Sequence, residues 1–113
     1  MNNENPIIDI NGLAHVILTV SNFEKAHEFY SKLLPKFGMS LIHDGPDFCY
    51  HVGGRTAIGI RRCDPEYANE RFQQYRVGLH HLCFRARTMK DVDETARLAS
   101  KIGAKICLLY TST

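Results

Sequence analysis

Apolar and polar residues alternate along a stretch near the start of the chain, from Leu13 to Val20, and again from Leu79 to Ala86. Side chains that alternate in this way point to opposite faces of a β-strand. One face carries Val16, Leu18 and Val20 in the first stretch, and Leu82, Phe84 and Ala86 in the second. The pattern therefore predicts two strands, each packed by its apolar row beneath the helix that follows it.

The two stretches are copies of one unit. Gly12, Leu13 and His15 recur at the same spacing as Gly78, Leu79 and His81. A fixed internal period indicates a repeated structural module. His15 and His81 occupy matching positions, and the alternation turns both away from the helices. If one sheet joins the two copies, these imidazoles share a concave surface and are candidate metal ligands.

A helix is predicted directly after the first strand. Ser21, followed by Glu24 three residues later, matches a capping box. The apolar residues then recur at helical spacing until Pro35: they are Phe23, Ala26, Tyr30, Leu33 and Leu34. This spacing is typical of an amphipathic helix of about three turns.

Three further strands are predicted in the first half, over residues 39–43, 48–52 and 56–61. Gly38 allows the reversal into the first of them. The Gly53-Gly54 pair suits the positive backbone angles of a tight hairpin between the last two. The first half therefore has the order strand, helix, strand, strand, strand.

The second half begins as a copy of the first. Residues 63–77 are expected to connect the halves, with a short exposed helix over 67–75. Thr88 predicts the cap of a second helix that stops at Gly103. Its apolar stripe is Val92, Ala96, Ala99 and Ile102. A strand is expected over residues 105–110, and no sequence follows for the two strands that would complete the copy.

Composition restricts the classes of protein to consider. The chain of 113 residues is 44% apolar and 23% charged, which is ordinary for one globular domain. Its net charge of +2 is scattered, so a nucleic-acid surface is not expected. No apolar run approaches the roughly 20 residues of a membrane span, and no signal segment is visible, so we expect a cytoplasmic protein. The four cysteines form no Cys-x-x-Cys pair and are expected to be free, buried thiols.

These features together resemble the vicinal oxygen chelate superfamily, the group of glyoxalases, bleomycin-resistance proteins and extradiol dioxygenases. The resemblance rests on the two histidine-bearing strands, on Phe29-Tyr30 followed by Leu33-Leu34 and Gly38, and on the segment 78–84. It implies an α+β fold of paired βαβββ modules. The expected arrangement is an N-terminal arm (1–11) and one domain (12–113), made of module 1 (12–62), a linker (63–77) and an incomplete module 2 (78–113).

The resemblance also implies a divalent metal ion, such as Fe, Mn, Ni or Zn, held by residues of the first and fourth strands. His15 and His81 match the first-strand ligands. The fourth strand of module 1, residues 56–61, has no Glu, His or Asp, and module 2 lacks its fourth strand. Metal affinity is therefore expected to be weak unless another chain or a substrate oxygen completes the site.

Two further residues are weaker catalytic candidates. Arg85 shares a strand face with His81, where it could neutralise an anionic substrate or form a salt bridge. Tyr50 and His51 lie on opposite faces of their strand, so only one of them can line the cavity. The remaining histidines are interpreted as packing or surface residues: they are His27, His43, His51 and His80.

Three functions stay open at this point. The leading one is a metal-dependent enzyme, either a lyase or isomerase of the glyoxalase type or a dioxygenase, that chelates vicinal oxygens of a small substrate. The second is a metal-free protein of the bleomycin-resistance type that sequesters a small molecule such as a drug. The third is an inactive fragment. An incomplete curved sheet also leaves apolar surface, for which association into a homodimer is expected.

Overall fold

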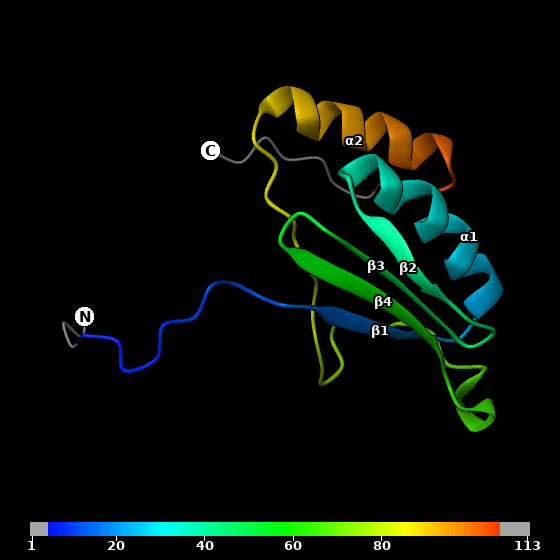
Figure 1. The fold of residues 1–113 in the computed structure, drawn as a ribbon. Coiled ribbons are helices and arrows are strands. Elements are labelled where there is room, and N and C mark those ends of the chain that lie inside the picture. Colours follow the sequence, from blue (N-terminus) through cyan, green and yellow to red (C-terminus); the bar gives the residue numbers. More distant parts are fainter. Residues whose placement is uncertain (1–4, 107–113) are drawn as a thin grey trace.

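The computed structural model describes residues 5–106 and contains a βαβββ unit followed by a linker and a second helix (Figure 1). The βαβββ unit consists of β1 (Val16–Val20), α1 (Phe23–Leu33), the short 3-10 helix η1 (Leu34–Phe37), β2 (Ser40–Asp44), β3 (Phe48–Gly53) and β4 (Thr56–Arg62). The second half contributes the 3-10 helix η2 (Pro65–Tyr67) and α2 (Met89–Lys101). The predicted α+β class, with one βαβββ module and an incomplete second module, is confirmed.

The four strands form one sheet in the order β1-β4-β3-β2. β1 and β4 run parallel, with Leu18 opposite Ile60, and the other pairs are antiparallel. The crossover through α1 and two hairpins gives this order, because a parallel neighbour needs a long connection whereas antiparallel neighbours need only turns. β4 therefore lies inside the sheet, between β1 and β3.

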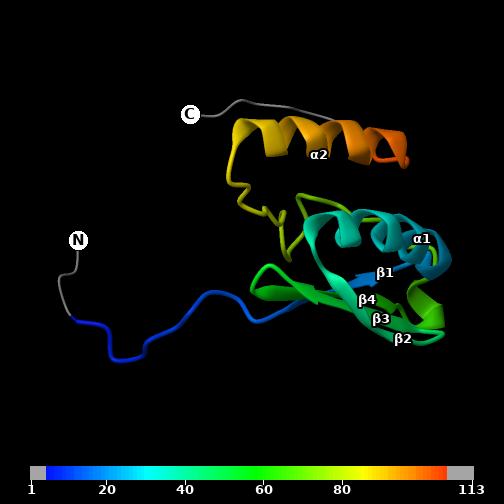
Figure 2. The same cartoon turned by 45° about the horizontal axis from the view of Figure 1, so that its top comes forward.

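One face of the sheet is covered by α1 and forms the core (Figure 2). Its buried cluster comprises Phe23, Leu34, Met39, Cys49, Ile58 and Ile60. Val16, Leu18 and Val20 of β1 pack against this cluster, whereas Ile17 and Thr19 between them are exposed. The alternation predicted for the first strand is thus confirmed.

The opposite face of the sheet is not covered by α1 or α2 (Figures 1 and 2). We call it the open face. Strand alternation and the pairing register place these residues on it: Ile17, Thr19, Phe48, Tyr50, Gly59 and Arg61. Two cross-strand rows result, Thr19–Arg61–Phe48 and Ile17–Gly59–Tyr50.

The start of α1 differs from the prediction by one residue. Asn22, not Ser21, is the N-cap, and its Oδ1 accepts a hydrogen bond of 3.1 Å from the backbone N–H of Lys25. Asn is at least as good a cap as Ser, since its short side chain reaches the third helical N–H. The carboxylate of Glu24 is consequently free of the predicted capping box and binds Arg62 instead.

The predicted hairpin between the third and fourth strands is present, with its centre shifted by one residue. Gly53 pairs with Thr56, and the two central residues are Gly54 (φ 60°) and Arg55 (φ 65°). Two consecutive positive φ angles are typical of the type I′ turn, which matches the twist of the flanking strands. Arg55 is the one non-glycine residue with positive φ in the described part of the chain.

Two elements predicted in the second half do not form. Residues 79–86 belong to no strand, because no other strand of the described residues lies beside them to complete a ladder. The predicted helix over 67–75 is reduced to the single turn η2. Phe72 and Tyr75 in that segment are 74% and 91% exposed, and a short helix without apolar packing is unstable in water.

The second helix forms as predicted. Thr88 caps α2, its Oγ1 accepting a 3.1 Å hydrogen bond from the N–H of Asp91, and Gly103 (φ 107°) follows the helix end. The predicted apolar stripe is half-buried. The strand expected over 105–110 lies mostly outside the described residues. Neither helix combines the length and apolar character needed to cross a membrane, as far as residues 5–106 are concerned.

We predict that Gly53→Ala destabilises the fold by about 1–3 kcal/mol. A Cβ at this position would lie 2.4 Å from the carbonyl oxygen of Gly38 and 2.8 Å from Cα of Met39, and backbone atoms cannot move aside cheaply. Urea unfolding checks this. Arg55→Gly in the same hairpin is the contrasting variant: it relieves a left-handed residue and should stabilise by up to about 1 kcal/mol. Equal stability of Gly53→Ala and the wild type would contradict the packing described.

Candidate functional site

A row of aromatic side chains crosses the open face. The rings of Phe48 and Tyr50 are stacked with their centroids 5.8 Å apart. His43 of β2 lies 5.8 Å from Phe48 at one end, and His15 lies edge-on to Tyr50 at 6.4 Å at the other. Aromatic faces in such a row offer a flat, polarisable surface for a planar ligand.

The absence of a side chain at Gly59 shapes this surface. A Cβ on Gly59 would lie 2.9 Å from Cε1 of Phe48 and 3.1 Å from Cγ1 of Ile17. The Phe48 ring therefore lies across β4 at a position where any other residue would displace it. Gly59 thus sets how closely Phe48 and Ile17 approach each other on the open face.

A hollow of about 580 Å³ opens where β3 begins and β4 ends. It is lined by Ile17, Asp47, Phe48, Arg61, Arg62, Cys63, Asp64 and Pro65. We call it the aromatic hollow. Volumes of this order are common for small-molecule sites, which usually combine apolar walls with a few polar groups.

Two consecutive arginines of β4 line the hollow from opposite faces of the sheet. Arg62 lies on the α1 side, where its guanidinium donates to Asp47 Oδ1 (2.8 Å), to both carboxylate oxygens of Glu24 and to the carbonyl of Pro46 (3.0 Å). Arg61 lies on the open face, is exposed, and makes no ion pair or side-chain hydrogen bond with another described residue. Arg61 therefore supplies an unpaired positive charge beside the Phe48 ring.

The Arg62 network joins three parts of the fold. It ties β4 to the start of α1 and to the β2–β3 turn, and its guanidinium carbon lies 4.9 Å above the Phe23 ring. The hydrogen bonds from Arg62 hold the pKa of Glu24 below its ordinary value. The bonds to Glu24 and Asp47 likewise raise the pKa of Arg62. This arginine is fully committed to structure and is not available to a ligand.

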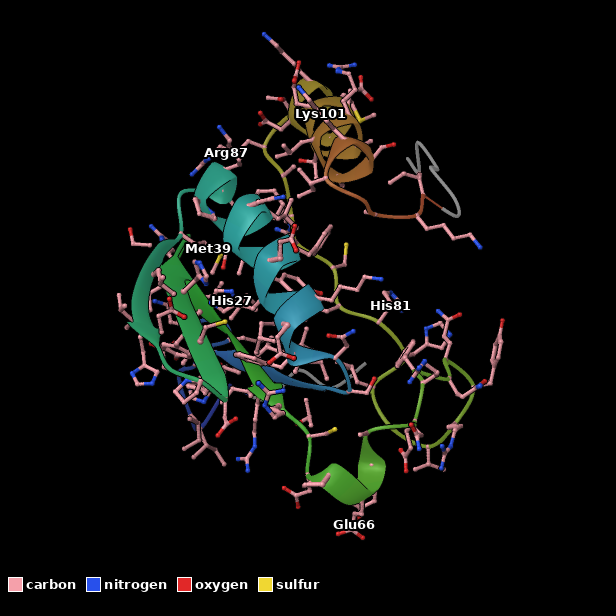
Figure 3. All side chains as sticks on the ribbon, turned by 90° about the vertical axis from the view of Figure 1, so that its right-hand side faces the viewer. His27, Met39, Glu66, His81, Arg87 and Lys101 are labelled. Carbon is pink, nitrogen blue, oxygen red and sulfur yellow. The ribbon has the colours of Figure 1, made fainter. Side chains whose placement is uncertain are left out.

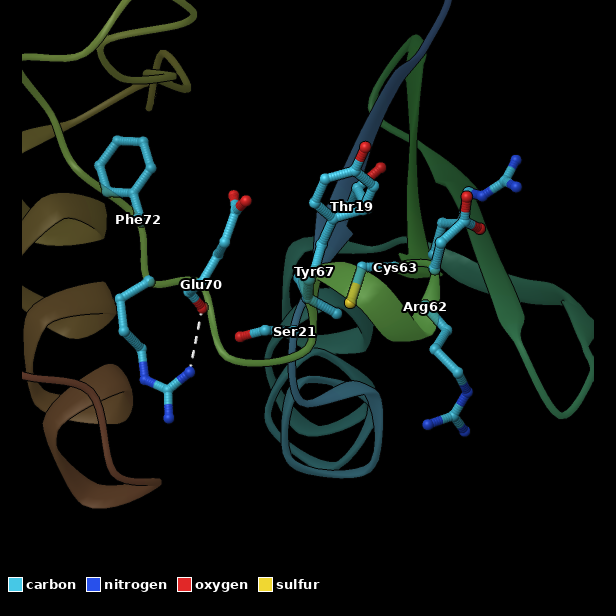
Figure 4. Close-up of a pocket in the computed structure, with 11 residues that line it drawn as sticks. Thr19, Ser21, Arg62, Cys63, Tyr67, Glu70 and Phe72 are labelled. Carbon is cyan, nitrogen blue, oxygen red and sulfur yellow. Dashed lines mark hydrogen bonds between the residues drawn. The ribbon is translucent and has the colours of Figure 1, made fainter.

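A second hollow of about 640 Å³ adjoins the first at the carboxyl ends of β1 and β4. Figure 4 shows Thr19, Ser21, Cys63 and Tyr67 on one side of it and Phe72 on the other. The two hollows share Arg61, Arg62, Cys63 and Asp64. Arg71 donates a 3.0 Å hydrogen bond to the carbonyl of Glu70 at its rim. This second hollow is lined by both polar and apolar groups and extends the aromatic hollow towards the linker.

The two histidines predicted as metal ligands lie in different surroundings. His15 is on the open face against Tyr50. His81 lies in the segment between η2 and α2, with α1 between it and β2 in Figure 3. Its Nδ1 is 2.8 Å from Nδ1 of His80, and His80 in turn is 3.2 Å from the side-chain amide of Gln74. The contacts of His15 and His81 are thus with separate partners.

The described residues do not supply a complete metal site. Among residues 5–106, no group of three or more His, Cys, Asp or Glu side chains is placed to hold a metal ion. Structural and catalytic metal sites in proteins usually use three or four protein ligands. His15 and His81 as ligands stay a prediction, and that prediction requires donors beyond those described.

The pairing register assigns the other candidates to faces. Tyr50 lines the open face, and His51 is buried under α1, which settles the alternative left by strand parity. Arg85 is exposed in the segment that precedes α2. His27 does have a partner, since its Nε2–H donates a 2.7 Å hydrogen bond to Asp44 Oδ1. Of the cysteines within residues 5–106, Cys49 is buried, Cys63 half-buried and Cys83 exposed, all free, so in this range the expectation of buried thiols holds only for Cys49. Cys107 lies outside the described residues.

Sequence reasoning did not identify Phe48, Gly59 and Arg61 as site residues. The signal was present in β4, whose alternate residues Ala57, Gly59 and Arg61 contrast with Ile58 and Ile60. Only the register shows that Arg61 stands beside Phe48, because cross-strand neighbours cannot be read from one strand alone.

The chain belongs to the Glyoxalase/Bleomycin resistance protein/Dioxygenase superfamily, whose family model matches residues 12–107. This assignment agrees with the βαβββ order of the first half of the chain. No curated protein matches the chain.

Solved structures give the same fold. A candidate glyoxalase from Bacillus halodurans is 25% identical, with a TM-score of 0.72 over 80% of this chain and 68% of that one. A mutant of the fosfomycin resistance protein FosX from Listeria monocytogenes, complexed with Mn(II) and 1S,2S-dihydroxypropylphosphonic acid, is 23% identical (TM-score 0.57; 86% and 68% covered). A lactoylglutathione lyase from Agrobacterium tumefaciens is 19% identical (TM-score 0.53; 88% and 72% covered).

We predict that Glu24→Gln lowers the melting temperature at neutral pH, because it removes the charge that Arg62 binds. The pKa of Glu24 in the folded chain lies below 4.5, so this stabilisation is complete above pH 4.5 and is lost as the pH falls through the folded pKa. The difference in melting temperature between variant and wild type should therefore shrink in acid.

Thermal unfolding followed by circular dichroism checks the Glu24 prediction. Glu28→Gln on the same helix is the matched control, since it removes only the exposed pair with Lys32 (3.2 Å) and should have a smaller effect. If the melting temperature of Glu24→Gln stays below that of the wild type by the same amount as the pH falls, the role assigned to the charge of Glu24 is contradicted.

Proposed function

We propose that this chain is a small-molecule-binding module of the glyoxalase and bleomycin-resistance group, and that its ligand is a small oxygenated anion with a planar part. The ligand binds on the open face, in the aromatic hollow, with its planar part on Phe48 and its anionic group on Arg61. Among the three functions that the sequence left open, this proposal is closest to the metal-free binding protein, since the binding described uses no metal ion.

The observation that carries the proposal is the juxtaposition of Arg61 with Phe48. The two residues are register partners on adjacent antiparallel strands, and the Cβ atoms of such partners lie about 5 Å apart. A planar guanidinium can bind a carboxylate or phosphonate with two hydrogen bonds. A ring with an attached anionic group would satisfy both side chains at once.

The contrast with Arg62 supports the same assignment. Arg62 is neutralised by Glu24 and Asp47, whereas Arg61 has no partner among the described residues. Asp47, which also lines the hollow, is held by Arg62. The charge left to interact with a ligand is therefore mainly that of Arg61, with Asp64 at the rim.

A metal-dependent enzyme, a lyase or isomerase or a dioxygenase, is the second candidate. His15 favours it, because this imidazole lies on the same open face as the aromatic hollow, against Tyr50. Because His15 and His81 need further donors, we derive no reaction step through a metal ion.

We predict that benzoate binds more tightly than benzamide, which has the same planar ring without the charge. Arg61→Gln should reduce benzoate affinity by roughly three- to tenfold and leave benzamide unchanged, since an exposed ion pair contributes about 1 kcal/mol. Phe48→Ala should weaken both. Dissociation constants from ligand-observed NMR titrations measure this.

Arg55→Gln is the matched control for the benzoate experiment. Arg55 is also an exposed arginine, but it lies in the β3–β4 hairpin turn, at the opposite end of β4 from Arg61. Its substitution should not alter the preference for benzoate. A preference that survives Arg61→Gln, or that is lost in Arg55→Gln, would show that the anionic group binds elsewhere.

For the second candidate, we expect no rise in melting temperature with Mn²⁺, Ni²⁺, Zn²⁺ or anaerobic Fe²⁺, because the described residues present no set of three ligands. His15→Ala and His81→Ala are tested in parallel. A rise that either substitution abolishes would instead establish these histidines as ligands and favour the metal-dependent enzyme.

A further inference from the structure

His51 is the one polar side chain among the fully buried residues of the described chain. It is 0% exposed, as are Cys49 and Ile60 beside it on the α1 side of the sheet. Its cross-strand neighbours are Leu41 on β2 and Ile58 on β4. The imidazole therefore sits inside the layer between α1 and the sheet.

Neither ring nitrogen of His51 has a hydrogen-bond partner among residues 5–106. A neutral imidazole carries one donor and one acceptor, and an imidazolium carries two donors and a positive charge. Buried polar groups are nearly always paired, because leaving them unpaired forfeits their hydration. Protonation would add a second unpaired donor and a buried charge to this core.

Among the surrounding groups, the carboxylate of Asp44 favours the imidazolium, but burial and the nearby His27 outweigh it. The titratable and charged groups that face this layer are His27 and Tyr30 on α1, Asp44 on β2, Cys49 on β3 and Arg62 on β4, with the exposed Lys36 on η1. Asp44 is engaged by His27 at 2.7 Å, and Arg62 is paired with Glu24 and Asp47. Lys36 is exposed, and burial raises the pKa of Tyr30 and of Cys49, so these two stay neutral.

We propose that His51 is an acid-sensitive switch in the core, whose protonation loosens the packing of α1 and η1 on the sheet. Loss of this packing would also reach the open face, because the preceding residue of β3 is Tyr50, which stacks with Phe48 there. The proposal concerns the packing of the chain itself and does not depend on which ligand the open face binds.

The direction of the pH dependence follows from the folded state. Burial, aided by the nearby His27, lowers the pKa of His51 below its ordinary value of 6.5. The unfolded chain therefore binds the proton more readily than the folded chain. The contribution of neutral His51 to the free energy of unfolding is fully present above pH 6.5. It is lost progressively as the pH drops from 6.5 to the folded pKa. Carboxylates such as Glu24, whose folded pKa lies below 4.5, titrate outside this window.

The test is the urea unfolding constant of the full chain between about pH 8 and about pH 5.5, for the wild type, His51→Met and His51→Gln. One titrating group changes this constant by at most about tenfold per pH unit. In the wild type we expect the unfolding constant to rise progressively below pH 6.5. In both variants the part of this rise that comes from His51 should be absent. His51→Met, which removes the unpaired nitrogens, should also be at least as stable as the wild type at about pH 8.

His43→Gln is the matched control, because His43 is an exposed histidine of the neighbouring strand. It should keep the acid response of the wild type. An acid response unchanged in both His51 variants overturns the proposal. If both variants fail to fold, the imidazole proton signal of His51 in the wild type decides: titration below pH 6.5 that precedes unfolding supports the switch, and titration at or above 6.5 in the folded chain overturns it.

Discussion

The alternation of side chains along β4 is the constraint on which the rest of the structure depends. β4 lies inside the sheet, bonded to β1 on one side and β3 on the other. Ile58 and Ile60 face α1 and are 2% and 0% exposed, so the core is built on this face of the strand. Gly59 and Arg61 must then face the other way, and they define the open face. A shift of one residue in register would exchange the two sets.

This constraint explains why two adjacent arginines have different roles. Arg62 follows Ile58 and Ile60 on the α1 side, where it joins the start of α1 to the β2–β3 turn. Arg61 is turned to the open face, away from the carboxylates that neutralise Arg62. The same alternation on β3 puts His51 in the core and Tyr50 on the surface. Packing on one side of the sheet thus determines which chemical groups are left on the other.

Much of the fold could be predicted from the sequence, because its signals are local. Period-two alternation located β1, and the strands from Ser40, Phe48 and Thr56 begin within one residue of their predicted starts. Thr88 and Gly103 correctly bound α2. The strand over 79–86 was predicted on equally clear alternation and is absent, because a strand also needs a neighbour with which to form hydrogen bonds. The cap at Asn22 was missed because Ser21 is an equally suitable capping residue.

The candidate site was less accessible to sequence reasoning, because it depends on the register between strands. The histidine repeat drew attention to His15 and His81, which the fold places against Tyr50 and His80 respectively. The pairing of Arg61 with Phe48, and the space that Gly59 leaves for the Phe48 ring, follow only from the assembled sheet. Strand parity could show that Tyr50 and His51 face opposite ways, but the packing of α1 decides which of them is buried.

The most direct test of the central claim, that the open face of β4 and β3 is the ligand surface, is backbone-amide NMR mapping during a benzoate titration. The largest shifts are expected at Phe48, Gly59 and Arg61, with smaller ones at Ile17 and Thr19. Shifts confined to residues 67–72, or to the segment around His81, would contradict this claim.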